Sequence, residues 1–112
     1  MAPNPIIFAL ANPTPEILPP DAERLGAFIV ATGRSDFANQ INNSLVFPGI
    51  FRGLLATGVQ SVTMEVKQAT ALAIANSVRN PSPKNIIPES LDPDIPHVIV
   101  KEIRKIQNKG AL

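Results

Sequence analysis

Two short apolar segments near the start of the chain predict strands. Residues 6–11 read IIFALA and are followed by NPTP, and residues 27–31 read AFIVA and are followed by TGRSD. Continuous apolar runs of this length, bounded by turn-forming residues, are typical of strands in a parallel sheet that helices cover on both faces. The pattern therefore predicts two short parallel strands, at about 6–11 and 27–31.

The pattern of apolar and polar positions also predicts four helices, at about 20–25, 48–57, 63–78 and 94–108. Gly26 can end the first helix, and Thr63 can cap the third. Isoleucines at positions 95, 99, 103 and 106 give the last helix one apolar face. Gly49 and Gly53, four residues apart in the second helix, predict close packing against a neighbouring backbone.

The order strand, helix, strand places the ends of both strands at one edge of a sheet. Such a connection is almost always right-handed, so Asn12 and residues 33–36 share the carboxyl edge, where ligands bind in open α/β sheets. The loop that leaves the second strand reads NQINNSLVFPG over residues 39–49. An amide-rich loop running directly into an apolar segment is unusual for a solvent-exposed turn, and we interpret its amides as placed for a ligand.

Two strands are too few for a complete sheet. A doubly wound α/β domain normally has several strands, which cover its helices and reduce its free edges. The sequence thus predicts an α/β fold with two parallel strands and about four helices. We interpret residues 1–112 as a single partial domain, either the C-terminal part of a larger α/β domain or a subunit that completes its sheet with a partner.

Composition narrows the class of protein. The 112 residues are 45% hydrophobic, with five Phe and no Trp or Tyr, which fits a globular domain with a methyl-rich core. The net charge of +1 comes from dispersed residues and predicts no binding to nucleic acid or to an anionic membrane. Without Cys, disulfides and thiolate metal sites are excluded, and without a long apolar run we expect a cytoplasmic protein.

Residues that carry out catalysis are scarce. His97 is the only histidine, and we interpret it as a surface residue of the last helix. The acidic residues lack the spacing of a metal site, and Ser35 lacks the surroundings of a nucleophile. The sequence therefore predicts neither a catalytic residue nor a metal ligand in this chain.

Uncharged amides are the better candidates for ligand binding. Asn12 and Asn43 could recognise a carboxamide, hydroxyl or carboxylate, or could equally serve only to form turns. Arg34, which follows Gly33, could bind an anion, or could instead pair with Asp36 or Asp21. Both interpretations stay open at this point.

Three ordered motifs resemble a known family. Residues 4–16 read NPIIFALANPTPE, residues 31–37 read ATGRSDF, and residues 39–49 carry the loop described above. With residues 85–88 and the last helix, they resemble the C-terminal part of the NAD-binding domain of malic enzyme, a Rossmann-like doubly wound domain, in its compact bacterial and archaeal form.

The resemblance implies oxidative decarboxylation of malate to pyruvate and CO2, with NAD or NADP as the hydride acceptor and Mg or Mn as the metal. It assigns substrate contacts to Asn12 and Asn43. It also implies that Asn12 contacts the nicotinamide, and Asn42 lies beside Asn43. As further candidate dinucleotide contacts we name Asn42 together with Gly33, Arg34 and Ser35, because the backbone N–H groups and the guanidinium of this loop could meet an anion.

Several functional parts of the resembled family are absent from this chain. It contains no Tyr for the family's tyrosine acid and no counterpart of its lysine base, its acidic metal ligands or its Gly-rich dinucleotide motif. We therefore expect the chain alone to be inactive and to need the remaining part of the enzyme or another subunit. The competing hypothesis is a free-standing, noncatalytic α/β module that binds a nucleotide or a protein.

Overall fold

The computed structural model describes residues 1–110, which form two compact units. Unit 1 comprises residues 1–42 and 80–88, and unit 2 comprises residues 43–79 and the described residues from 89 onward. The predicted α/β composition, with two parallel strands and four α-helices, is confirmed. That the whole chain forms a single partial NAD-binding domain stays a prediction.

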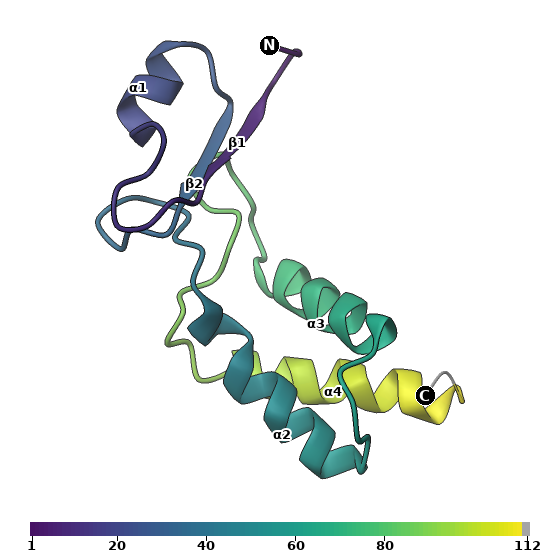
Figure 1. Ribbon diagram of the computed structural model, residues 1–112. Helices are drawn as coiled ribbons and strands as arrows, with labels where there is room; N and C mark the ends of the chain where they lie inside the picture. Colours follow the sequence, from purple (N-terminus) through teal and green to yellow (C-terminus); the bar gives the residue numbers. More distant parts are fainter. Residues whose placement is uncertain (111–112) are drawn as a thin grey trace. The chain divides into compact units, whose positions relative to one another are not determined.

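Unit 1 contains the two strands and the first helix. Strand β1 (Ile6–Ala9) pairs in parallel with β2 (Ile29–Thr32), with Ile6 opposite Ile29 and Ala9 opposite Thr32 (Figure 1). Helix α1 (Pro19–Arg24) connects the strands and packs against β2. β1 is shorter than the predicted 6–11 because the Ala11 N–H donates to Glu16 instead of continuing the ladder.

The sheet of unit 1 is covered unequally. Side chains alternate between the two faces of a strand, and on one face Ala9, Val30 and Thr32 are all buried. On the other face Ala31 of β2 is fully buried, but Ile6 of β1 is 61% exposed and Phe8 of β1 is 53% exposed. The predicted cover on both faces is therefore incomplete, because this unit has a single helix to pack against the strands.

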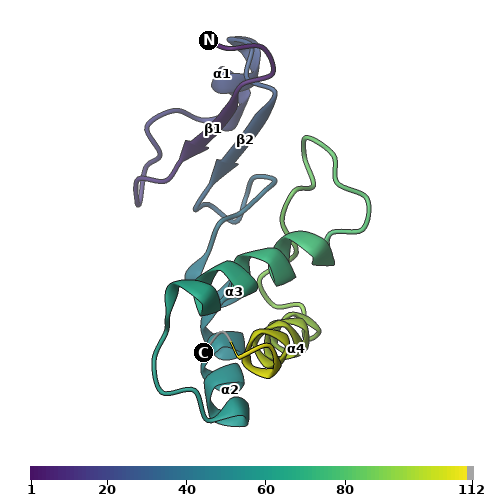
Figure 2. The same ribbon diagram turned by 90° about the vertical axis from the view of Figure 1, so that its right-hand side faces the viewer.

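Unit 2 is helical. It contains α2 (Phe47–Thr57), α3 (Met64–Ser77), α4 (Ile95–Asn108) and a short 3-10 helix, η1 (Asn43–Leu45). Helix α4 packs against both α2 and α3 (Figure 2). The α4 isoleucines at positions 95, 99 and 103 are almost fully buried, as their spacing predicts. The predicted Thr63 cap forms as well, with the Val66 N–H donating to its hydroxyl oxygen at 3.2 Å.

Two glycines let α2 approach α4 closely. A Cβ added at Gly49 would lie 2.5 Å from Cδ1 of Ile99, and one at Gly53 would lie 2.5 Å from Cδ1 of Ile103. Both distances are well below van der Waals contact, so a side chain at either glycine would have to displace an isoleucine of α4. The helices do pack closely here, but against the predicted backbone contact only Gly49 comes near a backbone atom, Pro96 Cα at 3.2 Å, and the other neighbours are isoleucine side chains.

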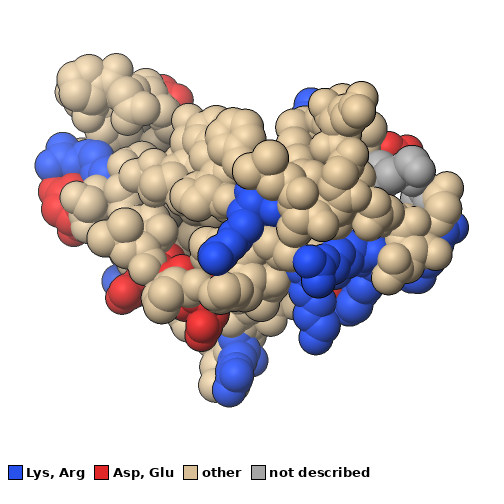
Figure 3. All heavy atoms as spheres, turned by 90° about the horizontal axis from the view of Figure 1, so that it is seen from below, with Lys and Arg blue, Asp and Glu red and all other residues tan. Residues whose placement is uncertain are grey.

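On the face drawn in Figure 3, residues other than Lys, Arg, Asp and Glu cover most of the area. Over residues 1–110, none of the helices combines the length and the apolar character needed to span a membrane.

Candidate functional site

The ends of β1 and β2 bring Asn12 and Gly33 together. A Cβ added at Gly33 would lie 3.0 Å from Oδ1 of Asn12, so the missing side chain leaves room for the carboxamide. The loop that carries Asn12 is closed by Glu16, whose Oε1 accepts a 2.8 Å hydrogen bond from the Ala11 N–H. Two of the predicted site residues, from loops after different strands, therefore lie side by side.

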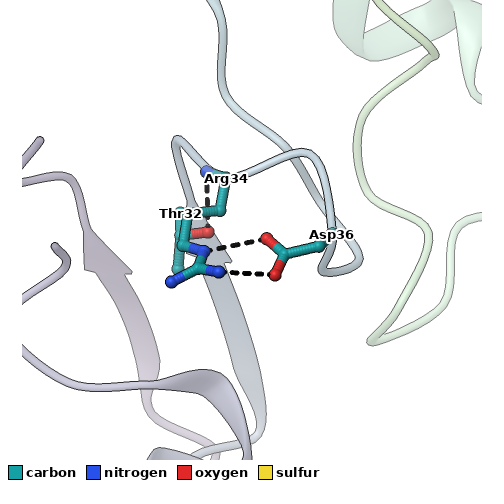
Figure 4. A network of polar contacts seen from close by, with 3 residues as sticks. All are labelled: Thr32, Arg34 and Asp36. Atoms are coloured by element: carbon teal, nitrogen blue, oxygen red, sulfur yellow. Dashed lines mark hydrogen bonds and ion pairs between the residues drawn. The ribbon is translucent and has the colours of Figure 1, made fainter. Parts of the chain in front are cut away.

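Arg34 forms an ion pair within its own loop. Its Nε and Nη2 donate to the two carboxylate oxygens of Asp36 at 2.8 and 2.6 Å, and its backbone N–H donates to Oγ1 of Thr32 at 3.1 Å (Figure 4). The guanidinium also lies 5.4 Å from the centre of the Phe37 ring. Of the two acidic partners that the sequence suggested, Asp36 is the one used, and Asp21 pairs with Arg24 instead.

The pairing shifts the titration of both groups. The hydrogen bonds from Arg34 lower the pKa of the Asp36 carboxyl, and the bonds to Asp36 raise the pKa of the guanidinium. Both side chains are exposed to solvent, so the pair organises the loop more than it stabilises the fold. An anion that binds Arg34 would compete with Asp36 for the same donors.

The loop after β2 returns to the strand that it left. Gln40 bridges to Thr32 in a parallel pairing, and the Ile41 N–H donates to the Thr32 carbonyl at 2.8 Å. The Gln40 side chain donates to the Gly33 carbonyl at 3.4 Å. These bonds fix the loop against the end of β2.

Asn39 has a structural use that corrects one interpretation. Its carboxamide is buried and forms three hydrogen bonds to the backbone of unit 1. The interpretation that the amides of residues 39–49 are placed for a ligand is therefore wrong for Asn39. A carboxamide that satisfies neighbouring backbone groups is not available to a ligand.

The remaining predicted residues are exposed. Ser35 lies in the loop that carries Arg34. Asn42 is the last residue of unit 1 before the chain enters unit 2, and Asn43 is the first residue of η1. Both asparagines are accessible to solvent at the point where the chain passes from one unit to the other.

Among residues 1–110 no three His, Cys, Asp or Glu side chains gather as they would around a metal ion. His97 is exposed on α4, as predicted.

Sequence reasoning missed three residues that shape the site: Glu16, Thr32 and Asn39. Thr32 is fully buried at the end of β2, and its hydroxyl holds the backbone of Arg34. Glu16 could have been found as an acidic residue shortly after the Asn-Pro turn. Thr32 could have been found as a polar residue at the end of an apolar strand. Asn39 gave no such signal, because its partners are backbone groups.

Parallel strands with polar side chains gathered at their carboxyl ends are typical of the ligand-binding edge of an open α/β domain. The family model described as "Malic enzyme, NAD binding domain" matches residues 1–106. The chain belongs to the malic enzyme family, within its NAD-binding domain.

Individual relatives agree with this assignment. The chain is 48% identical over 107 residues to the bifunctional malic/malolactic enzyme of Bacillus subtilis, covering 94% of this chain and 26% of that protein. It is 55% identical over 78 residues to the NAD-dependent malic enzyme of Geobacillus stearothermophilus, covering 70% of this chain and 16% of that protein. The crystal structure of malic enzyme from Pyrococcus horikoshii superposes with a TM-score of 0.91 at 48% identity, covering 96% of this chain and 25% of that one. The chain thus spans about a quarter or less of the length of these relatives.

Proposed function

We propose that this chain supplies one wall of the active site of an NAD- or NADP-dependent malic enzyme. The complete enzyme would convert malate to pyruvate and CO2, with the dinucleotide accepting the hydride from malate C2. The rest of the enzyme, as further chain or as another subunit, supplies the other wall. We expect this enzyme to work in the cytoplasm.

The observation that carries the proposal is the contact between Asn12 and Gly33. A carboxamide placed at the carboxyl ends of two parallel strands lies where α/β domains bind dinucleotides. It offers two donors and one acceptor without charge, which matches the carboxamide of nicotinamide and the hydroxyl of malate. Asn12 is therefore suited to hydrogen-bond both malate and the nicotinamide and so to hold them next to each other.

Asn43 is proposed to contact malate, and Asn42 the dinucleotide. The backbone of Gly33 and Ser35 would line the cofactor from the β2 side, and Arg34 would meet an anionic part of it only by sharing its donors with Asp36. These residues orient malate C2–H against the nicotinamide ring and transfer no proton themselves.

Proton transfer and metal binding are assigned to the rest of the enzyme. The chain has no Tyr, and residues 1–110 hold no cluster of metal-binding side chains. We therefore expect the 112-residue chain alone to show no malate-dependent reduction of NAD(P) in the presence of Mn²⁺.

A hybrid enzyme tests the proposal. The matching region of the Bacillus subtilis relative, 107 residues long, is replaced by the corresponding residues of this chain. We expect the hybrid to reduce NAD or NADP with malate and Mn²⁺. Asn12→Ala and Asn43→Ala should each lower kcat/KM for malate roughly tenfold to a hundredfold, as expected for loss of hydrogen bonds to the reacting molecules.

Asn76→Ala is the matched control, because Asn76 is exposed on α3. It should leave kcat/KM unchanged. A folded hybrid without turnover would contradict the proposed function and favour the noncatalytic module. Equal activity of the Asn12 and Asn43 variants and the control would remove these two residues from the site.

A further inference from the structure

Asn39 joins the end of β2 to the segment of residues 80–88. Its Nδ2 donates to the Val30 carbonyl at 3.1 Å and to the Pro83 carbonyl at 2.9 Å, and its Oδ1 accepts from the Ile86 N–H at 3.0 Å. The residue is only 7% exposed. One carboxamide thus uses both its donor and its acceptor ends to connect two segments more than 40 residues apart in sequence.

These bonds occupy the edge of β2 that faces away from β1. Alternate residues of a parallel strand direct their backbone groups to the same edge, and Ile29 uses its N–H toward Pro5, on the β1 side. Val30 and Thr32 therefore present their carbonyls to the opposite edge, where Asn39 Nδ2 and the Ile41 N–H bind them. Residues 39–41 thus replace a neighbouring strand at this position.

The backbone at this position restricts which residue can form the connection. Asn39 has a φ of +59°, in the left-handed region that Gly and Asn tolerate best. Gly would accept this backbone but has no carboxamide, and most other residues would be strained there. Asn satisfies both requirements.

The connection precedes the proposed ligand contacts by three residues. Since Asn39 and Ile41 are both held on β2, they fix the backbone that leads to Asn42 within the same unit. We infer that Asn39 is a positioning residue of the dinucleotide site, acting through Asn42 without touching the ligand. This inference rests on the proposed function for its effect on catalysis.

The structural step is tested on the 112-residue chain by hydrogen exchange with mass spectrometry. Asn39→Gly keeps the backbone allowed and removes the carboxamide. We expect exchange of the Ile86 and Ile41 amides to become at least tenfold faster, because their bonded positions are no longer held, while peptides from α3 and α4 keep their protection. Asn39→Asp keeps an oxygen acceptor for the Ile86 N–H but has no Nδ2 donor. Its exchange rates at Ile41 and Ile86 should lie between those of the unsubstituted chain and those of Asn39→Gly.

Asn4→Gly is the matched control, since Asn4 also has a positive φ, of +52°, and is exposed. It should leave every peptide unchanged. Unchanged exchange at Ile41 and Ile86 in Asn39→Gly would overturn the inference. So would a uniform loss of protection over both units, which would mark Asn39 as a residue of general stability.

The catalytic step is tested in the hybrid enzyme. Asn39→Gly should raise KM for NAD(P) and lower kcat/KM about tenfold, whereas a loss of folded enzyme would lower the maximal rate with KM unchanged. An unaltered KM despite faster exchange at residues 40–42 would also overturn the inference. If the unsubstituted hybrid is inactive, the proposed function fails, and the exchange experiment still decides whether Asn39 positions the loop.

Discussion

Glu16 shows how a single side chain can hold a ligand-binding residue in place. Its carboxylate accepts the Ala11 N–H and so closes the loop in which Asn12 lies. This hydrogen bond, more than any other influence, lowers the pKa of the Glu16 carboxyl below the usual 4.5. The ionised form is thus the one that holds the loop closed.

A titration checks this role. A carboxyl whose pKa is lowered in the folded chain contributes its bond above its ordinary pKa and loses it as the pH falls through the lowered value. We expect the NMR titration midpoint of Glu16 to lie below 4.5, with the Ala11 amide signal shifting in the same step. In Glu16→Gln, which keeps an oxygen acceptor but does not ionise, the amide signal should be independent of pH. A Glu16 midpoint at or above 4.5 would contradict the assignment.

Asn12, Gly33 and Arg34 could be singled out from sequence because each follows an apolar strand in a turn-forming context. The sequence could not show whether Arg34 pairs with Asp36 or Asp21. The pairing with Asp36 depends on the backbone conformation of the loop, which the order of residues does not define. The Asn39 contacts were beyond sequence reasoning for a different reason. They join backbone atoms of residues far apart in the chain, and no side-chain pattern marks such atoms.

At the scale of elements, the helices were predictable and the strand ends were not. The isoleucine spacing of α4 and the glycine spacing of α2 follow directly from the period of the helix. The end of β1 at Ala9 instead depends on the acceptor of one backbone N–H, because the Ala11 N–H donates to Glu16 and does not extend the ladder toward β2. Burial of both faces of the sheet was expected because both strands are apolar. The apolar content of a strand does not show how many helices pack against it.

The α2–α4 contact makes a prediction about stability. Gly53→Ala gains about 1 kcal/mol of helix propensity, but it places a methyl group 2.5 Å from Ile103 Cδ1, and overpacking of this kind costs roughly 1–3 kcal/mol. Ile103 is fully buried, and the difference between these two terms gives an expected net loss of about 0–2 kcal/mol in the free energy of unfolding. Urea denaturation followed by circular dichroism at 222 nm measures it.

A double variant separates the steric clash from other effects. Ile103→Val removes Cδ1, and the remaining neighbours of an added Cβ are then at ordinary contact distance. Gly53→Ala with Ile103→Val should therefore be about 1 kcal/mol more stable than the sum of the single changes predicts. Arg52→Ala, on the exposed side of the same helix, is the control. Additive effects would mean that the clash is relieved by some other movement.

At the scale of the whole molecule, each unit presents apolar surface that it does not cover itself. Ile6 and Phe8 lie on the open face of the sheet in unit 1. In unit 2, Phe47 stacks on Phe51, and with Leu55, which is 86% exposed, they form an apolar stripe along α2. Contiguous apolar surface of this kind is typical of an interface. Further strands of the sheet can pair only with β1, because residues 39–41 occupy the other edge of β2.

We therefore expect the isolated chain to self-associate. Sedimentation velocity should show species heavier than the 12.0 kDa monomer at micromolar concentration. Phe51→Lys together with Leu55→Lys should shift the distribution toward monomer, because two charges interrupt the α2 stripe without disturbing a buried contact.

Glu65→Lys, at an exposed position of α3, supplies a comparable change of charge away from the stripe and should have no such effect. A purely monomeric wild-type chain across the concentration range would show that these surfaces do not drive association.

The two units are interleaved along the chain, which crosses from one to the other between residues 42 and 43, 79 and 80, and 88 and 89. Neither unit is therefore encoded by one uninterrupted stretch of the gene. A recombination event that exchanged residues 1–42 alone would leave residues 80–88 from the original parent. Asn39 would tolerate that mixture, because its partners are backbone atoms, which every parent provides in the same form.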